Sequence, residues 1–194
     1  MQRKGQKMIA VEMEPSTVKP FMNRILREEI MDNFETRAVE MTITTRISIN
    51  GAIEPPSQAI AGATMEAANI HPEANQPSQQ SPGVLSEALS ESKPQHQGYI
   101  SWEALRPLIF SIIKTGAKPK QIKVVFSYKA AEITTIHPNA AALFLNMTYE
   151  NDQVYFTTAT AQKNFALDKS LDDNWDGWVR NFFNLNGIPV TDRE

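Results

Sequence analysis

Three segments of the sequence carry apolar side chains at the spacing of an amphipathic helix. The first follows a turn and helix cap at residues 14–16, and the second covers about 101–115. The third begins at Ser170, whose spacing to Asp173 is that of a capping box, and closes at residues 186–187. The predicted buried faces of the three helices are Val18, Phe21, Met22, Ile25, Leu26 and Ile30; Trp102, Leu105, Leu108, Ile109, Ile112 and Ile113; and Leu171, Trp175, Trp178, Val179 and Phe182.

Strict alternation of apolar and polar residues predicts the strands. The clearest runs from Val39 to Ile49, and Asn50-Gly51 after it predicts a hairpin turn that leads briefly back through Ala52 and Ile53. Another strand is expected at 122–128. The remaining predictions are a hairpin of residues 143–149 and 154–161 around Asn151-Asp152, short strands at 7–13 and 164–167, and a short helix or loop at 129–139.

Strands and helices do not alternate regularly along the chain, which argues against a parallel sheet with crossover helices. We therefore expect an α+β fold of two layers, in which a mainly antiparallel sheet of about six strands carries three amphipathic helices on one face.

The composition changes between residues 54 and 98. This segment holds 6 of the 12 prolines, 6 glutamines, 6 serines and 7 alanines, and it has no aromatic residue. Such a stretch buries too little apolar surface to offset the entropy lost on ordering. We expect residues 1–53 and 99–194 to form a single α+β domain and residues 54–98 to form a flexible Pro/Gln/Ser/Ala-rich insert. Residues 81–89 could form a short docking helix, but we favour a plain loop.

The chain of 194 residues has a net charge of -3 and no cysteine. Lack of cysteine excludes structural disulfides, thiolate nucleophiles and thiolate metal sites. No stretch approaches the roughly 18 apolar residues of a membrane span, and the apolar run at 8–13 is too short for a signal core. We expect a cytoplasmic protein that does not associate with membranes.

Few motifs in the sequence carry chemistry. Residues 172–177, Asp-Asp-Asn-Trp-Asp-Gly, match the first half of a calcium-binding loop, but Phe183 stands where the bidentate glutamate is required. No glycine-rich nucleotide loop occurs, and we expect neither a metal nor a cofactor. His137 is the only histidine outside the insert, so an enzyme would need His137 with Asp168 and a hydroxyl such as Ser127 or Thr158.

Two further surfaces could bind a partner. The lysines at 114, 118, 120 and 123 could contact nucleic acid, although the folded part carries a net charge of only +1 outside the insert. The second surface comes from the predicted C-terminal hairpin, whose outward side chains mix aromatics with hydroxyls and an amide, as contact surfaces do. The predicted binding residues are Phe144, Asn146, Thr148, Tyr155 and Thr157 of the hairpin, joined by Val125 of the strand at 122–128. A cover by the insert or by the N-terminal segment is an equal alternative.

Residues 143–149, 156–160 and 165–171, ending at Trp175-Asp176, resemble the C-terminal half of a family of uncharacterised Firmicutes proteins with a domain of unknown function. Phe21-Met22-Asn23, Arg106-Pro107 and residues 123–126 are also similar to it, whereas the long insert and a shortened segment near 129–139 depart from it. The family has no assigned activity. The resemblance therefore implies a bacterial, cytoplasmic origin and no catalytic residues.

These observations favour a non-catalytic binding or protein-interaction module. It would bind an unknown protein partner, or a second copy of itself, through the outward face of the sheet. The alternatives are an enzyme with a site around His137 and Asp168, or a weak nucleic-acid-binding protein that uses the cluster from Lys114 to Lys123.

Overall fold

The computed structural model describes residues 9–54, 98–115 and 117–193, which form seven strands and four α-helices. Residues 55–97, with the short helix considered at 81–89, lie outside the described residues. The elements are β1 (Ala10–Met13), α1 (Pro15–Arg27), a 3-10 turn (Glu29–Met31), β2 (Phe34–Thr42), β3 (Arg46–Asn50), α2 (Trp102–Thr115), β4 (Gln121–Tyr128), α3 (Ile133–Ile136), β5 (Ala140–Glu150), β6 (Gln153–Gln162), α4 (Ser170–Leu185) and β7 (Val190–Asp192).

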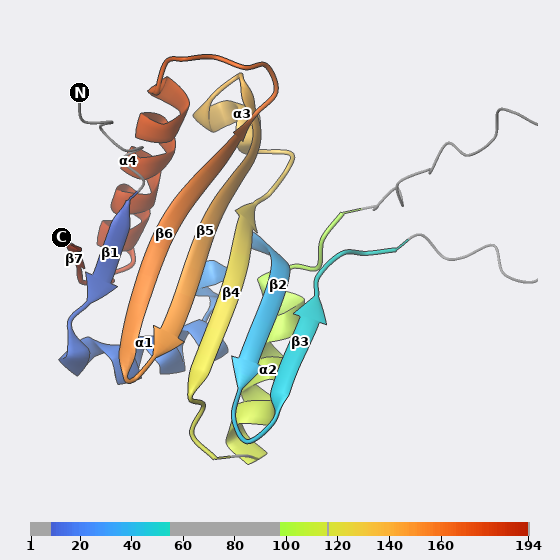
Figure 1. Ribbon diagram of the computed structural model, residues 1–194, viewed down its shortest axis with the longest axis vertical. Helices are drawn as coiled ribbons and strands as arrows, with labels where there is room; N and C mark the ends of the chain where they lie inside the picture. Colours follow the sequence, from blue (N-terminus) through green and yellow to red (C-terminus); the bar gives the residue numbers. More distant parts are fainter. Residues whose placement is uncertain (1–8, 55–97, 116, 194) are drawn as a thin grey trace, which may run out of the picture.

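All seven strands belong to one open sheet, in the order β3-β2-β4-β5-β6-β1-β7, and every neighbouring pair is antiparallel. Helices α1, α2 and α4 all lie on the same face of this sheet (Figure 1). No described helix lies on the other face, which carries Val125, Asn146 and Thr157 and which we call the open face. The predicted two-layer α+β fold is confirmed.

Aromatic side chains hold α4 against the sheet. Trp178 stacks on Trp175 with ring centroids 5.1 Å apart, and it stacks on Phe182 at 5.5 Å. Phe34 of β2 meets Phe182 edge-on at 5.4 Å. Rings of this size bury large apolar areas and gain further from offset and edge-to-face contacts. The spacing of these residues along α4 thus supplies a continuous aromatic stripe that faces the sheet.

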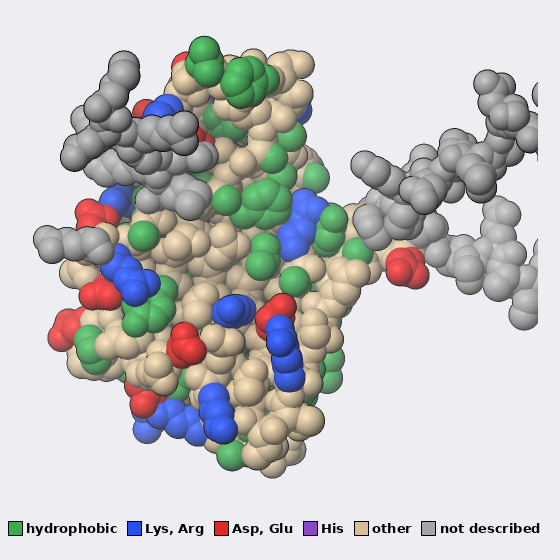
Figure 2. All heavy atoms as spheres, in the orientation of Figure 1, with side chains coloured by type: hydrophobic (Ala, Val, Ile, Leu, Met, Phe, Trp, Pro, Cys, Tyr) green, Lys and Arg blue, Asp and Glu red, His purple; other side chains and the backbone are tan. Residues whose placement is uncertain are grey.

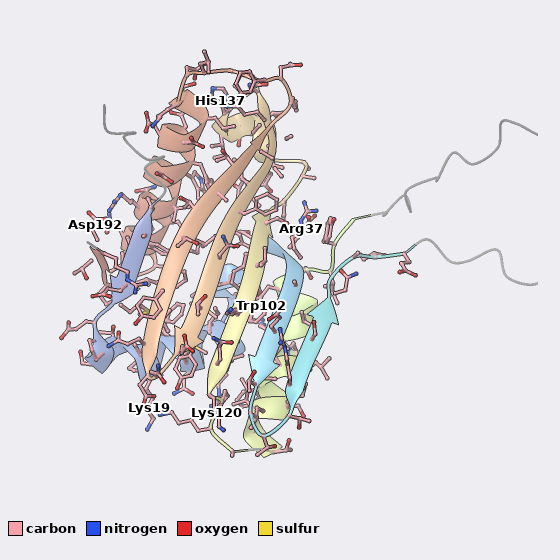
Figure 3. All side chains as sticks on the ribbon, viewed as in Figure 1. Lys19, Arg37, Trp102, Lys120, His137 and Asp192 are labelled. Atoms are coloured by element: carbon pink, nitrogen blue, oxygen red, sulfur yellow. The ribbon has the colours of Figure 1, made fainter. Side chains whose placement is uncertain are left out.

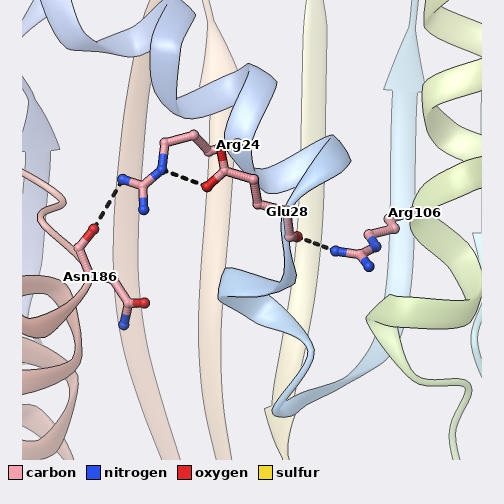
Figure 4. Close-up of polar contacts among 4 residues, drawn as sticks. All are labelled: Arg24, Glu28, Arg106 and Asn186. Carbon is pink, nitrogen blue, oxygen red and sulfur yellow. Dashed lines mark hydrogen bonds and ion pairs between the residues drawn. The ribbon is translucent and has the colours of Figure 1, made fainter.

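Polar contacts join the three large helices at one point (Figure 4). Arg24 of α1 donates to the carboxylate of Glu28 at 3.0 Å and to the carbonyl of Asn186, just after α4, at 3.0 Å. Arg106 of α2 donates to the Glu28 carbonyl and lies 3.3 Å from the carboxylate of Asp32. These arginines satisfy carbonyls that helix ends leave without a partner.

The continuous strand predicted from Val39 to Ile49 is wrong, because a turn at residues 43–45 divides it into β2 and β3. Ile49 pairs with Val39 across the two strands, and Ile47 pairs with Met41. Paired residues point to the same side of a sheet, so the apolar side chains return to the same face after the turn. The alternation of apolar and polar residues is therefore the same before and after the turn. Because the turn also contains no glycine, proline or asparagine, the sequence pattern does not reveal it.

The hairpin predicted at Asn50-Gly51 is also wrong. Gly51 instead continues from β3 alongside the bulge of β2, where its N–H donates to the carbonyl of Arg37 at 3.0 Å. A Cβ at Gly51 would lie 1.8 Å from the carbonyl oxygen of Thr36, so only glycine fits. Ala52 then bridges to Tyr99, so two described stretches of chain that are distant in the sequence meet at this edge of the sheet.

Smaller predictions fail at the C-terminal end. Residues 164–167 form no strand, and Phe165 and Leu167 are each 88% exposed. Ser170 is the first residue of α4 rather than its cap. No pattern of apolar residues predicted β7, which has only three residues. By contrast, the short helix or loop expected at 129–139 agrees with the single turn of α3.

We predict that Gly51→Ala lowers the free energy of unfolding by about 2 to 3 kcal/mol, because the backbone of β2 must move to accept the methyl group. Gly177→Ala is the matched control: nothing lies within 4 Å of a Cβ there, within α4. It should raise stability by about 0.5 to 1 kcal/mol through helix propensity. Thermal and urea unfolding followed by circular dichroism measure the stability of both variants. Equal changes in the two variants would contradict the close contact between Gly51 and the backbone of β2.

Candidate functional site

The six predicted binding residues all lie on the open face, close to its centre. Val125 of β4 pairs with Asn146 of β5, which pairs with Thr157 of β6. Thr148 and Tyr155 form a pair in the next row on one side. All are partly exposed, and the Asn146 amide donates to the Thr157 hydroxyl at 3.3 Å.

Phe144 occupies the row on the opposite side of Asn146, where it pairs with Ser127 and Ala159. Its main chain is fixed from the helical layer, because the indole N–H of Trp175 donates to the Phe144 carbonyl at 2.9 Å. The ring of Phe144 lies on the open face, whereas the backbone carbonyl of Phe144 accepts a hydrogen bond from Trp175, a core residue of α4. The hairpin register and this bond together position the aromatic residue.

Arg37 contacts the Phe144 end of the face and was not predicted. The β2–β4 register shifts between Thr36 and Ala38, and this bulge directs Arg37 toward the open face. Its guanidinium lies 3.4 Å from the centroid of the Tyr99 ring and 5.6 Å from that of Phe144. It also donates to the Ser127 hydroxyl at 2.8 Å. Arg37 thus covers Ser127, which is fully buried although it points to this face.

A second arginine lies over the other aromatic residue. The guanidinium of Arg193 is 4.5 Å from the centroid of the Tyr155 ring. It reaches there because β7 pairs with β1, which pairs with β6, and the Arg193 N–H donates to the Ala10 carbonyl at 2.8 Å. No local sequence pattern reveals this contact, since it depends on the order of three strands.

Charges of both signs surround the centre of the open face. Lys123 stands between Glu40 and Thr148 in one cross-strand row, and Glu12 pairs with Tyr155 in the same row. Figure 2 shows hydrophobic, basic and acidic side chains interspersed on this side of the molecule. Arg37 lies on β2, next to the edge strand β3 (Figure 3). The face is therefore a mixed aromatic and polar surface without one dominant sign of charge.

His137 and Asp168 lie at the end of the sheet where Figure 3 labels His137. The two side chains are connected by Ser170, which contacts both. His137 Nε2 is 3.1 Å from Ser170 Oγ, and the Ser170 hydroxyl donates to Asp168. The N–H of Asn139 donates to His137 Nδ1 at 3.2 Å, so Nδ1 is an acceptor and the proton resides on Nε2. A base that activates a serine needs the reverse arrangement.

The Asp168 carboxylate accepts both the hydroxyl and the N–H of Ser170, which lowers the pKa of Asp168. This is the bonding expected of a carboxylate placed beside the N-terminus of α4. The two hydroxyls considered with His137 are engaged elsewhere: Ser127 with Arg37, and Thr158 with Asp176. Asp168 and Ser170 therefore stabilise the start of α4. The hydrogen bonds around Ser170 do not run in the direction that a catalytic triad requires.

The other candidate motifs have structural roles. Residues 172–177 lie within α4 and so form no calcium loop, and the described residues contain no group of histidine and acidic side chains that could hold a metal. The lysine cluster divides: Lys118 pairs with Asp152, whereas Lys123 lies on the open face opposite Glu40. Lys114 lies in the last turn of α2, where a cation complements the helix dipole.

Comparison with known proteins identifies a family, but one whose function is unknown. The model of a family of unknown function, DUF5721, matches residues 82–191, which is more than half of the chain. No curated protein and no solved structure matches the chain. Over the residues that the structure describes, no helix has the length and apolarity needed to cross a membrane.

We predict that Ser170 does not react with a fluorophosphonate probe, because its hydroxyl hydrogen points to Asp168 and His137 offers it no free lone pair. Intact-mass spectrometry after incubation with the probe tests this. Stoichiometric labelling that disappears in Ser170→Ala would contradict it and would support the enzyme alternative.

Asp176 should make stability depend on pH. Burial raises its pKa above 3.8, against the hydrogen bond from Thr158. The folded state then binds this proton more tightly than the unfolded state, so Asp176 opposes folding at neutral pH, and this opposition fades as the pH falls through the raised pKa. We expect Asp176→Asn to melt at or above the wild-type temperature at pH 7, with a difference that shrinks toward pH 4. Glu54→Gln, which removes an exposed carboxylate outside α4, is the control. A difference for Asp176→Asn that does not change with pH would contradict the prediction.

Proposed function

We propose that this chain, which belongs to the DUF5721 family of unknown function, is a non-catalytic module that binds another protein surface through its open face. The observation that carries the proposal is the pairing of two partly exposed aromatic residues with two arginines, Phe144 with Arg37 and Tyr155 with Arg193. Tyrosine, phenylalanine and arginine are enriched at protein interfaces, and buried tyrosine and arginine anchors often dominate their affinity.

The residues between these aromatics support the same conclusion. Asn146, Thr148 and Thr157 offer both donors and acceptors at the centre of the face. The strand register fixes their positions, so a partner would dock without ordering a loop. A face that met only water would be expected to carry mainly polar and charged side chains.

We further propose that the protein works in the bacterial cytoplasm without a cofactor. The absence of cysteine suits a reducing compartment. The resemblance of the C-terminal strands and of α4 to Firmicutes proteins supports the bacterial origin. The partner is either a different protein or a second copy of the chain, since a surface of this composition suits both.

The test replaces Phe144 and Tyr155 with serine. The matched control is Leu185→Ser, which removes an apolar side chain that is 78% exposed on α4, outside the open face. Sedimentation velocity measures self-association, and a photo-crosslinking residue at position 148 or at position 185 reports contacts in the cell. We expect association or a specific adduct from position 148, lost in the double variant and retained in the control.

The proposal is wrong if the folded double variant associates and crosslinks as the wild type does, or if position 148 gives no adduct beyond those from position 185. The same preparations are passed over heparin and DNA. Retention that weakens with salt and depends on the lysines at 114–123 would instead favour the nucleic-acid alternative.

A further inference from the structure

A largely apolar cleft of about 480 Å³ lies at the end of the sheet away from His137. One wall is α1, and the others are the end of α2, the start of β4 and the turn between β5 and β6. This volume falls within the range of roughly 300 to 1,000 Å³ that is usual for small-molecule sites. The apolar side chains that line it include Val18, Met22, Leu26, Ile113 and Ile122.

The polar groups of the cleft gather at its rim. Lys19 and Asn23 stand one helical turn apart on α1, so they project to the same side of that helix. Lys118 and Asp152 face them from the loop before β4 and from the hairpin turn, and Tyr149 stands beside Asp152. Figure 3 labels Lys19 and Lys120 at this same end of the sheet.

The one carboxylate at the rim is already neutralised. Asp152 accepts the Tyr149 hydroxyl at 3.0 Å and forms an ion pair with Lys118. Hydrogen bonds from Lys118 and Tyr149 lower the pKa of Asp152. The pKa of Tyr149 is raised, mainly because the phenol is partly buried. Lys19 has no ion-pair partner among the described residues. The remaining hydrogen-bonding capacity of the rim therefore consists mainly of donors, with a positive charge at Lys19.

We propose that this cleft binds a small organic acid with an aliphatic body, whose chain lies against the apolar walls and whose carboxylate meets Lys19 and Asn23. An apolar cleft favours any hydrophobic ligand through the area that it removes from water. The charge of the rim then selects among such ligands. A cationic head group would face Lys19 and would have to compete with Lys118 for Asp152, whereas an anionic one finds an ammonium and an amide donor.

This site is separate from the proposed protein-binding face. Its walls come from the helical layer and from the buried side of the sheet, because Ile122 and Tyr149 pair with each other and point toward the helices. The two proposals can therefore fail independently, and neither set of variants alters the other surface.

The test uses octanoate as the probe, with 1-octanol and octyltrimethylammonium as neutral and cationic ligands of equal chain length. Titration calorimetry gives the dissociation constants, and methyl NMR spectra locate the ligand. We expect octanoate to bind tightest and to shift the methyl signals of Val18, Leu26 and Ile113. Lys19→Glu should weaken octanoate about tenfold, as expected for reversing a partly screened charge. Lys169→Glu, the same change at the opposite end of the sheet, should have less than about a twofold effect.

Met22→Trp adds a second test, because its bulk should occupy the cleft and abolish octanoate binding in a variant that still melts cooperatively. Equal affinities for the three ligands, an unchanged constant in Lys19→Glu, or no saturable binding by the wild type would each overturn the proposal. If Met22→Trp does not fold, the exposed Lys19 variant and the choice among the three ligands still decide the outcome.

Discussion

The hydrogen bond from the Trp175 indole to the Phe144 carbonyl joins the two layers of the molecule where the candidate surface begins. A buried indole N–H without a partner is costly, so α4 can pack here only if a carbonyl of β5 is available. Trp175 also stacks on Trp178, which extends the contact along the helix. The same packing that buries the helical face therefore fixes the backbone of the strand whose opposite side carries Phe144.

The central hairpin was the part of the fold most open to prediction. Asn151 and Asp152 both have positive φ, as a two-residue hairpin turn requires. A loop of these two residues leaves one register, which must pair Tyr149 with Val154 and Met147 with Phe156, and both pairs are present. Five of the six predicted residues followed from this register, because a strand's alternation fixes the direction of every side chain once one pair is known. Val125 lies outside the hairpin, on β4, where it pairs with Asn146.

The features of the site that were not predicted depend on contacts between residues distant in the sequence. Arg37 reaches Phe144 only because β2 has a bulge beside Gly51, and alternation contains no sign of a bulge. Arg193 reaches Tyr155 only because β1 lies between β6 and β7. The apolar cleft likewise needs α1, α2 and the β5–β6 turn to converge. Each of these features is set by strand order and helix packing, which a local pattern does not encode.

The region that matches the family model cannot complete this sheet alone. Residues 82–191 contain β4, β5 and β6, but β2 pairs with the outer edge of β4 and β1 with that of β6. Both flanking strands come from the first 53 residues. An unpaired edge exposes backbone donors and acceptors that readily recruit other strands. The N-terminal segment therefore closes both edges of the central strands, and it also supplies Arg37 and Glu12 to the open face. The chemical character of that face thus depends on two separate parts of the chain, one inside and one outside the matched region.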